Sequence, residues 1–183
     1  LKRKIKSRPH AKTMNGNDYI IARADGLVHK YQTRNPYEIA KNLGIEVIRW
    51  DGFSRLKGMY RIIKRNRYIF INDNLDEQLC EIVCAHELGH DLLHRSLANS
   101  GIIKEIMLYD MSAKPEFEAN IFAAELLIPD EDILNLIKSQ NYTPEQLAHL
   151  LETDVNLISL KIYALNLKGY NFQIPAVASD FLK

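Results

Sequence analysis

His86-Glu87-Leu88-Gly89-His90 is the segment from which the architecture of this 183-residue chain can be inferred. It lies among apolar residues at helical spacing, which predict a helix over 75–95. Residues four apart share one helical face, about 6 Å apart along the axis, so the imidazoles of His86 and His90 can bind one tetrahedral Zn²⁺. Glu87 is rotated by about 100°, where it can hydrogen-bond a water beside the metal as catalytic base. The simpler alternative is a pair of surface histidines around a helical glutamate.

A hydrolytic zinc site needs a third protein ligand, and a second predicted helix offers one. This helix lies between Pro115 and Pro129 and carries three glutamates, which helical phase separates. Glu116 shares a face with small residues, where another helix can approach closely and a carboxylate must be paired or bound to metal. We therefore predict Glu116 as the third ligand, with Glu118 as the alternative; a first-turn glutamate that only complements the helix dipole is the simpler interpretation. Glu118 and Glu125 form a polar stripe that we expect to face water.

Two further polar residues are predicted to lie near the metal. His94 extends the row of histidines, but a straight helix places it about 12 Å from His86, so one ion cannot bind the whole row. We expect His94 to orient a ligand or to act as a cation at the helix C-terminus. Asn120 lies one turn after Glu116, from where it can orient a ligand histidine.

The remaining segments predict an α+β fold. The predicted elements, in chain order, are a helix at 36–43 capped by Asn35, strands at 45–50, 58–63 and 67–71, the helix at 75–95 capped by Asn74 and Glu77, the helix between the two prolines, a helix after the capping box Thr143-Pro144-Glu145-Gln146, and a helix at 155–167. Because Lys64-Arg65-Asn66 is a hairpin signal, we expect a small antiparallel sheet packed on the histidine helix. We divide the chain into a basic leader (1–13), a core (14–130) and a C-terminal helical lobe (131–183).

The composition is that of a globular protein. Apolar residues make up 46% and charged residues 26% of the chain, which excludes fibrous and generally disordered classes. No run approaches the ~18 apolar residues of a membrane span, and the N-terminus shows no secretory signal. Cys80 and Cys84 are expected as buried, reduced thiols. We therefore expect a cytoplasmic protein without a membrane partner, either a monomer or a weak dimer.

Two features raise the possibility of nucleic-acid binding. Residues 1–13 carry six Lys and Arg and no acid, so they form either a nucleic-acid arm or a flexible leader ahead of Met14. The segment 143–167 has helix-turn-helix character. Its second helix offers few basic side chains besides Lys161, with Lys168 at its end, so we expect it to cap the core or dock a protein. Nucleic acid is not expected as a direct ligand.

The two helical motifs together resemble those of a known family. His86-Glu-Leu-Gly-His-Asp-Leu-Leu-His94, followed by Glu116-x-x-Ala-Asn-x-Phe-Ala-Ala-Glu-Leu-Leu-Ile-Pro129, resembles the ImmA/IrrE-type metallopeptidases. The resemblance implies a gluzincin-like zinc core and proteolysis of a helix-turn-helix repressor, usually encoded nearby on a phage, a mobile element or a stress locus. Its E-x-x-A-N phrase parallels the third-ligand helix of gluzincins, which supports Glu116.

These observations give a mechanism as a hypothesis. Zn²⁺ would activate a water and polarise the scissile carbonyl, and Glu87 would move the proton to the leaving amine. His94 and Tyr109 are candidates for stabilising the oxyanion by residue type alone. By analogy with related peptidases, the strand at 67–71 would be an exposed sheet edge that pairs with the substrate. The strand residues concerned are Tyr68, Ile69, Phe70 and Ile71.

Two other functions remain open from the sequence. A non-proteolytic antirepressor would sequester the repressor and use the metal structurally. A DNA-binding regulator would use the basic leader and the segment 143–167, and its duplex binding would depend on salt.

Overall fold

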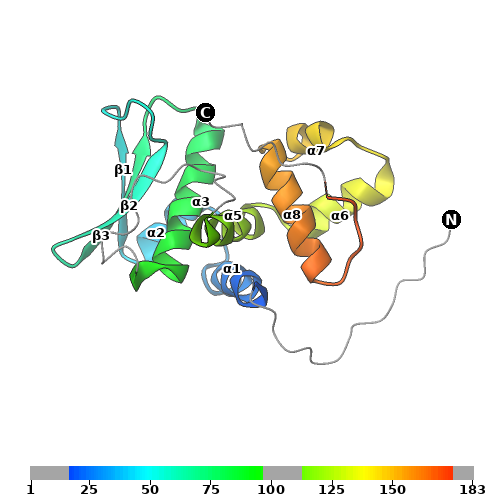
Figure 1. Cartoon of the computed structure of the whole chain (residues 1–183), viewed down its shortest axis with the longest axis horizontal. Helices are drawn as coiled ribbons and strands as arrows, with labels where there is room; N and C mark the ends of the chain where they lie inside the picture. Colours follow the sequence, from blue (N-terminus) through cyan, green and yellow to red (C-terminus); the bar gives the residue numbers. More distant parts are fainter. Residues whose placement is uncertain (1–16, 97–112, 175–183) are drawn as a thin grey trace.

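A computed structural model describes residues 17–96 and 113–174, so the leader 1–13 and Tyr109 lie outside the described residues. The described part is α+β, as predicted, with a small sheet beside a set of helices (Figure 1). Its elements are α1 (Asp18–Tyr31), α2 (Pro36–Asn42), β1 (Ile45–Trp50), β2 (Gly58–Ile63), β3 (Asn66–Asn72), α3 (Glu77–Leu93), α5 (Lys114–Leu127), α6 (Asp130–Ser139), α7 (Pro144–Leu150) and α8 (Val155–Leu167). No prediction covers helix α1.

The sheet is mixed rather than antiparallel, which corrects the prediction. Its strand order is β1-β3-β2, with β1 parallel and β2 antiparallel to β3. The hairpin between β2 and β3 is as predicted, with positive φ at Lys64 and Arg65, as a tight hairpin turn requires. The prediction that 67–71 is an exposed edge is wrong, because β3 is the central strand. Ile69 and Ile71 of β3 are fully buried. A strand with such apolar side chains is most stable in the middle of the sheet, because this position removes the most apolar surface from water.

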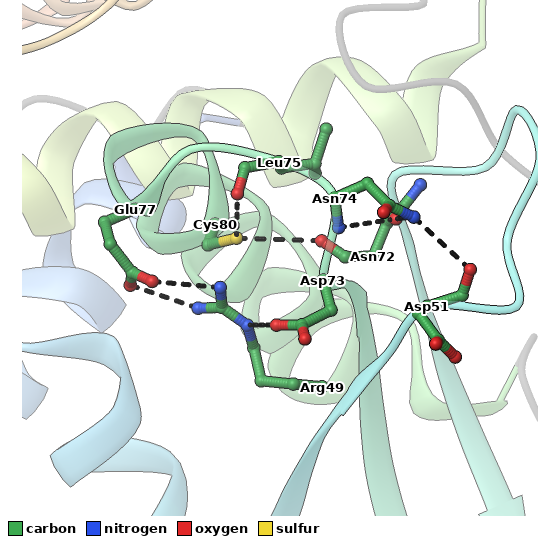
Figure 2. Close-up of polar contacts among 8 residues, drawn as sticks. All are labelled: Arg49, Asp51, Asn72, Asp73, Asn74, Leu75, Glu77 and Cys80. Carbon is green, nitrogen blue, oxygen red and sulfur yellow. Dashed lines mark hydrogen bonds and ion pairs between the residues drawn. The ribbon is translucent and has the colours of Figure 1, made fainter.

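Helix α3 begins two residues later than predicted. The side chain of Asp76 accepts a hydrogen bond from the Leu79 N–H and is the N-cap, so the prediction of Asn74 as the cap is wrong. Asn74 instead donates its backbone N–H to the side chain of Asn72, in the turn that connects β3 to the helix (Figure 2). In the same turn the Cys80 thiol lies 3.7 Å from the Asn72 carbonyl oxygen.

Arg49 connects the sheet to the start of α3 through ion pairs. Arg49 of β1 donates to the carboxylates of Asp73 and Glu77, as Figure 2 shows. Cys80 and Cys84 on this helix are both buried and free, as predicted.

Helix α5 crosses α3 at small residues. A Cβ atom added to Gly89 would lie 3.1 Å from the Cα atom of Ala119, so the two backbones approach closely there. Helix α1 packs on α5, and its Ile20, Ala24 and Leu27 are all buried. This close crossing carries the His-Glu-x-x-His motif and the predicted glutamate helix to the same place.

The C-terminal helices pack on α5 through α8. The capping box at Thr143 is present as predicted, and α8 has the predicted bounds. Lys161 on α8 is only 1% exposed and donates to Glu125 on α5, so it cannot contact a DNA phosphate in this arrangement. The prediction that Glu118 and Glu125 face water is wrong, because both are buried against basic side chains that lie elsewhere in the fold. Among the described helices, none has the length and apolar character needed to cross a bilayer.

Candidate metal centre

His86, His90 and Glu116 meet between α3 and α5. One ligand atom from each side chain lies within 4.8 Å of the others, and each residue is only 1% exposed. The Nε2 atoms of the two histidines are 3.0 Å apart. Each of them also lies 3.2 Å from an oxygen of the Glu116 carboxylate. The structure therefore brings together the three side chains that the sequence singled out.

The chemistry of this cluster fits a divalent metal ion. Oε1 of Glu116 is buried, and although it lies 3.2 Å from Nε2 of His90, the two atoms are not aligned as a hydrogen bond in the described structure. A buried polar atom without a partner costs about 1–3 kcal/mol, and a cation between the three side chains would satisfy it. Two imidazole nitrogens and one carboxylate oxygen are the donor set of catalytic zinc sites such as that of thermolysin. Because all three side chains are buried, the carboxylate of Glu116, rather than solvent, would offset part of the positive charge of such an ion.

Asn120 orients the first histidine. Its Oδ1 atom lies 2.8 Å from Nδ1 of His86, so the Nδ1–H group donates to the amide oxygen and the Nε2 lone pair faces the cluster. Asn120 is fully buried on α5, one turn after Glu116. The predicted contact with a histidine is therefore present, whereas its effect on metal binding is a prediction for experiment.

Burial and neighbouring charges shift the pKa values of the three cluster residues in different directions. Burial alone would raise the pKa of Glu116, but hydrogen bonds and charge from the histidines outweigh it and lower this pKa to about 2. Burial lowers the pKa of His90 to about 4. Burial also acts to lower the pKa of His86, but the carboxylates of Glu116 and Glu87 raise it overall. Metal binding requires a neutral imidazole with a free nitrogen lone pair, so the affinity of such a cluster for a metal ion depends on pH.

Glu87 lies beside the cluster and next to strand β2. It is 6% exposed, and burial raises the pKa of its carboxyl group to about 7. A Cβ atom added to Gly58 would lie 3.4 Å from Oε1 of Glu87, so the backbone of β2 passes directly beside the carboxylate. A carboxyl group with a pKa near neutrality can both accept and return a proton at physiological pH.

The other predicted residues lie outside the cluster. His94 is the C-cap of α3, and its Nε2 atom lies 3.4 Å from a carboxylate oxygen of Glu118. Glu118 also lies 3.7 Å from the ammonium group of Lys114, and within the described residues it does not approach the two cluster histidines as a ligand. Its place as the alternative third ligand is therefore not supported by the geometry.

A buried network around Asp91 was not predicted. The Asp91 side chain has no exposed surface. It accepts hydrogen bonds from Tyr60 on β2, from Arg67 on β3 and from Arg95, which follows the C-cap of α3. The one sequence signal for this network was Asp91 itself, an acidic residue between the second histidine of the motif and the apolar pair Leu92-Leu93. Its partners on the sheet could not be identified without the strand order.

The histidine pair on α3 and the facing carboxylate on α5 form the side-chain arrangement of metal-dependent peptidases. Residues 40–163 match the Peptidase_M78 family, described as the IrrE N-terminal-like domain, and the chain belongs to this family. The chain is 44% identical over 140 residues to the uncharacterized immunity region protein 2 of Bacillus phage phi105, which covers 72% of this chain and 87% of that protein. It is 33% identical over 139 residues to the metallopeptidase ImmA of Bacillus subtilis (strain 168), which covers 70% of this chain and 79% of that protein. No solved structure gives a significant match.

Proposed function

We propose that this protein is a zinc-dependent endopeptidase that cleaves a helix-turn-helix repressor and thereby relieves repression. The observation that carries the proposal is the buried cluster of His86, His90 and Glu116 with Glu87 beside it. The family and the relative named as a metallopeptidase support the reaction class. The relative named as an immunity region protein supports a phage or mobile-element setting, in which a repressor is the protein to be removed. A repressor substrate would place the enzyme in the cytoplasm.

The chain supplies binding, orientation and proton transfer. Bound zinc would supply Lewis acidity, which polarises the scissile carbonyl and makes a neighbouring water more acidic. Glu87 accepts the proton of that water and passes it to the nitrogen of the leaving amine. Asn120 and the buried crossing of α3 and α5 keep the ligand side chains in their places during this transfer.

The substrate lies along β2 in this proposal rather than along β3. Strand β2 is an edge of the described sheet, and its backbone passes beside Glu87 at Gly58. An edge strand has backbone N–H and C=O groups that an extended peptide can pair with. A substrate segment added to this edge would run past the catalytic carboxylate, which the central strand β3 does not allow.

The test is cleavage of the repressor encoded beside the gene for this protein. The purified zinc-loaded chain is incubated with that repressor, and the products are resolved by mass spectrometry. We expect the wild-type protein to cut it at one site and the Glu87→Gln variant to bind zinc equally well but to leave it intact. If the variant relieves repression as fully as the wild type, the protein acts as a sequestering antirepressor and the peptidase proposal fails.

A further inference from the structure

The two faces of strand β2 have different surroundings. Side chains alternate along a strand, so Gly58 and Tyr60 share one face, and Met59, Arg61 and Ile63 share the other. The first face packs on α3, where Gly58 approaches Glu87 and the Tyr60 hydroxyl reaches Asp91. The second face lies on the opposite side of the sheet from α3.

Arg61 is a cation without an anionic partner in the described structure. Its cross-strand neighbour on β3 is Tyr68, and its Nε atom donates to the sulfur atom of Met59 at 3.4 Å. Within residues 17–96 and 113–174, no carboxylate lies within ion-pair distance of its guanidinium group. The side chain is half-buried, so part of its hydration is already lost without compensation from a negative charge.

Arg61 lies on the same edge strand as the point of contact with Glu87. It comes three residues after Gly58, where the backbone of β2 passes beside the Glu87 carboxylate. On one side Arg61 is flanked by β3, and on the other side lies the edge of the described sheet. An extended segment that pairs with this edge therefore passes both Arg61 and the point where Gly58 approaches Glu87.

We propose that Arg61 determines substrate specificity: the extended segment that pairs with β2 carries an aspartate or glutamate opposite Arg61, and apolar side chains opposite Met59 and Ile63. The proposal rests on the peptidase function and names the substrate sequence that the β2 edge accepts. Directly opposite residues on neighbouring strands have Cβ atoms about 4.5–5.5 Å apart, so a carboxylate at that position reaches the guanidinium. Arginine binds a carboxylate through two parallel hydrogen bonds, which gives the pair geometric selectivity as well as attraction. The apolar flanks follow because Met59 and Ile63 bracket Arg61 on the same face.

The experiment separates binding from hydrolysis. The zinc-loaded Glu87→Gln protein is used as bait for a library of displayed peptides, and the bound sequences are compared with those selected by the Glu87→Gln/Arg61→Glu protein. Arg65→Glu in the same background is the matched control, because Arg65 lies in the exposed β2–β3 turn rather than on the strand. We expect the parent to enrich peptides with one acidic residue flanked at the second position on each side by apolar residues.

The variants decide the outcome. A hydrogen bond to a charged group contributes about 1.5–3 kcal/mol, so Arg61→Glu is expected to weaken binding of the selected acidic peptides by about 10- to 100-fold and to enrich basic ones instead. Arg61→Gln should lose the acidic preference without gaining a basic one, and its zinc content and unfolding curve should match those of the parent. The proposal is overturned if no acidic position is enriched, if no peptide is bound, or if Arg65→Glu has the same effect as Arg61→Glu. Cleavage of the repressor by the wild-type protein would still stand in each of these cases, so the two failures can be told apart.

Discussion

The hydroxyl group of Tyr60 donates a 2.6 Å hydrogen bond to the carboxylate of Asp91, the residue that directly follows the second histidine of the metal cluster. This bond joins the edge strand to the helix that carries Glu87, the proposed catalytic base. Two residues earlier on the strand, Gly58 has no side chain to hold β2 away from Val83 and Glu87. Gly58 and Tyr60 together therefore set the separation between the proposed substrate edge and Glu87.

Replacing Asp91 should be one of the most destabilising single changes in the chain. Asp91→Ala leaves Nη1 of Arg67 and the Tyr60 hydroxyl without their acceptor, while Nη2 of Arg67 keeps the carbonyl oxygen of Leu43. Removing one partner of a buried ion pair costs about 3–5 kcal/mol. We expect a loss of this size in the free energy of unfolding measured by urea denaturation. The control is Asp73→Ala, which breaks a more exposed pair with Arg49 and should cost about 0–1 kcal/mol; equal losses in the two variants would contradict the importance of the buried network.

Metal binding should distinguish the two neighbouring glutamates of α5. Glu116→Gln removes an anionic donor from the cluster, whereas Glu118→Gln alters a side chain that pairs with His94. We expect zinc affinity, measured by competition with a chromophoric chelator, to fall more than about 100-fold in Glu116→Gln, beyond the range for groups that only orient ligands. Zinc affinity of Glu118→Gln should stay close to that of the wild type. The reverse order would make Glu118 the ligand.

Asn120 should act on zinc affinity through His86 alone. In Asn120→Ala the Nδ1–H group of His86 loses its acceptor, and the ring is free to rotate or to change tautomer. Loss of such an orienting partner lowers metal affinity by about 10–100-fold. Asn120→Asp keeps an acceptor oxygen and should recover part of the affinity. If Asn120→Ala bound zinc as tightly as the wild type, the contact would have no role in holding the ligand.

Removing the metal should lower the stability of the fold. A ligand that binds only the folded state stabilises it by about 2.7 kcal/mol when its concentration is 100 times Kd. We expect the Tm of the chelator-treated protein to rise on adding zinc, and to do so in proportion to the logarithm of the zinc concentration. The Glu116→Gln variant is the matched control and should respond only at much higher zinc concentrations. A Tm that does not respond to zinc in the wild type would show that the cluster does not bind the ion.

The ion pairs between α5, α6 and α8 predict a pH dependence of stability. Burial alone would raise the pKa of Asp130, but hydrogen bonds from Lys161 and Lys168 outweigh it and lower this pKa below its ordinary value of 3.8. Because the folded state holds Asp130 at a lower pKa than the unfolded state, its stabilising effect is present above the ordinary value and is lost as the pH falls through the folded-state pKa.

The measurement for this prediction is the difference in unfolding free energy between the wild type and Asp130→Asn at several pH values. We expect a constant difference between pH 5 and 8 that becomes smaller below about pH 4, where the unfolded chain takes up a proton first. Asp132→Asn, an exposed change on the same helix, should show no such dependence. A difference that grew as the pH fell would mean that Asp130 is not held in its charged form by the two lysines.

The clustering of His86, His90 and Glu116 could be predicted from the sequence because its geometry is mostly local. The spacing of His86 and His90 within one helix fixes their relative positions, and the helical phase of α5 separated Glu116 from Glu118. The same phase argument failed for Glu125, which it placed in water. Glu125 is indeed on the other side of α5, but that side is covered by α8, whose Lys161 lies 36 residues further along the chain. A local sequence pattern cannot predict an ion pair with a residue so far along the chain.

The sheet shows the same limit. The hairpin of β2 and β3 follows from a short turn, so adjacent residues were enough to predict it. The parallel pairing of β1 with β3 joins strands that are not consecutive, and the strand order decides which edge is free. The error on the substrate edge arose from this non-local pairing. Helix α1 was not predicted for a different reason. Its apolar residues have helical spacing, but Gly26, a poor helix former, interrupts them.

The buried pair of Glu125 and Lys161 constrains how this chain can diverge. Glu125 also pairs with Lys168, and Lys161 also pairs with Asp130, so a single replacement at either position unbalances a group of two carboxylates and two ammonium groups. Sequence divergence there should therefore exchange members of this group together. The pair also argues against treating the C-terminal helices as a detachable module. A chain shortened after α6 would keep Glu125 and Asp130 but lose Lys161 and Lys168, the cations that neutralise them, and α5, which also carries Glu116, would be destabilised first.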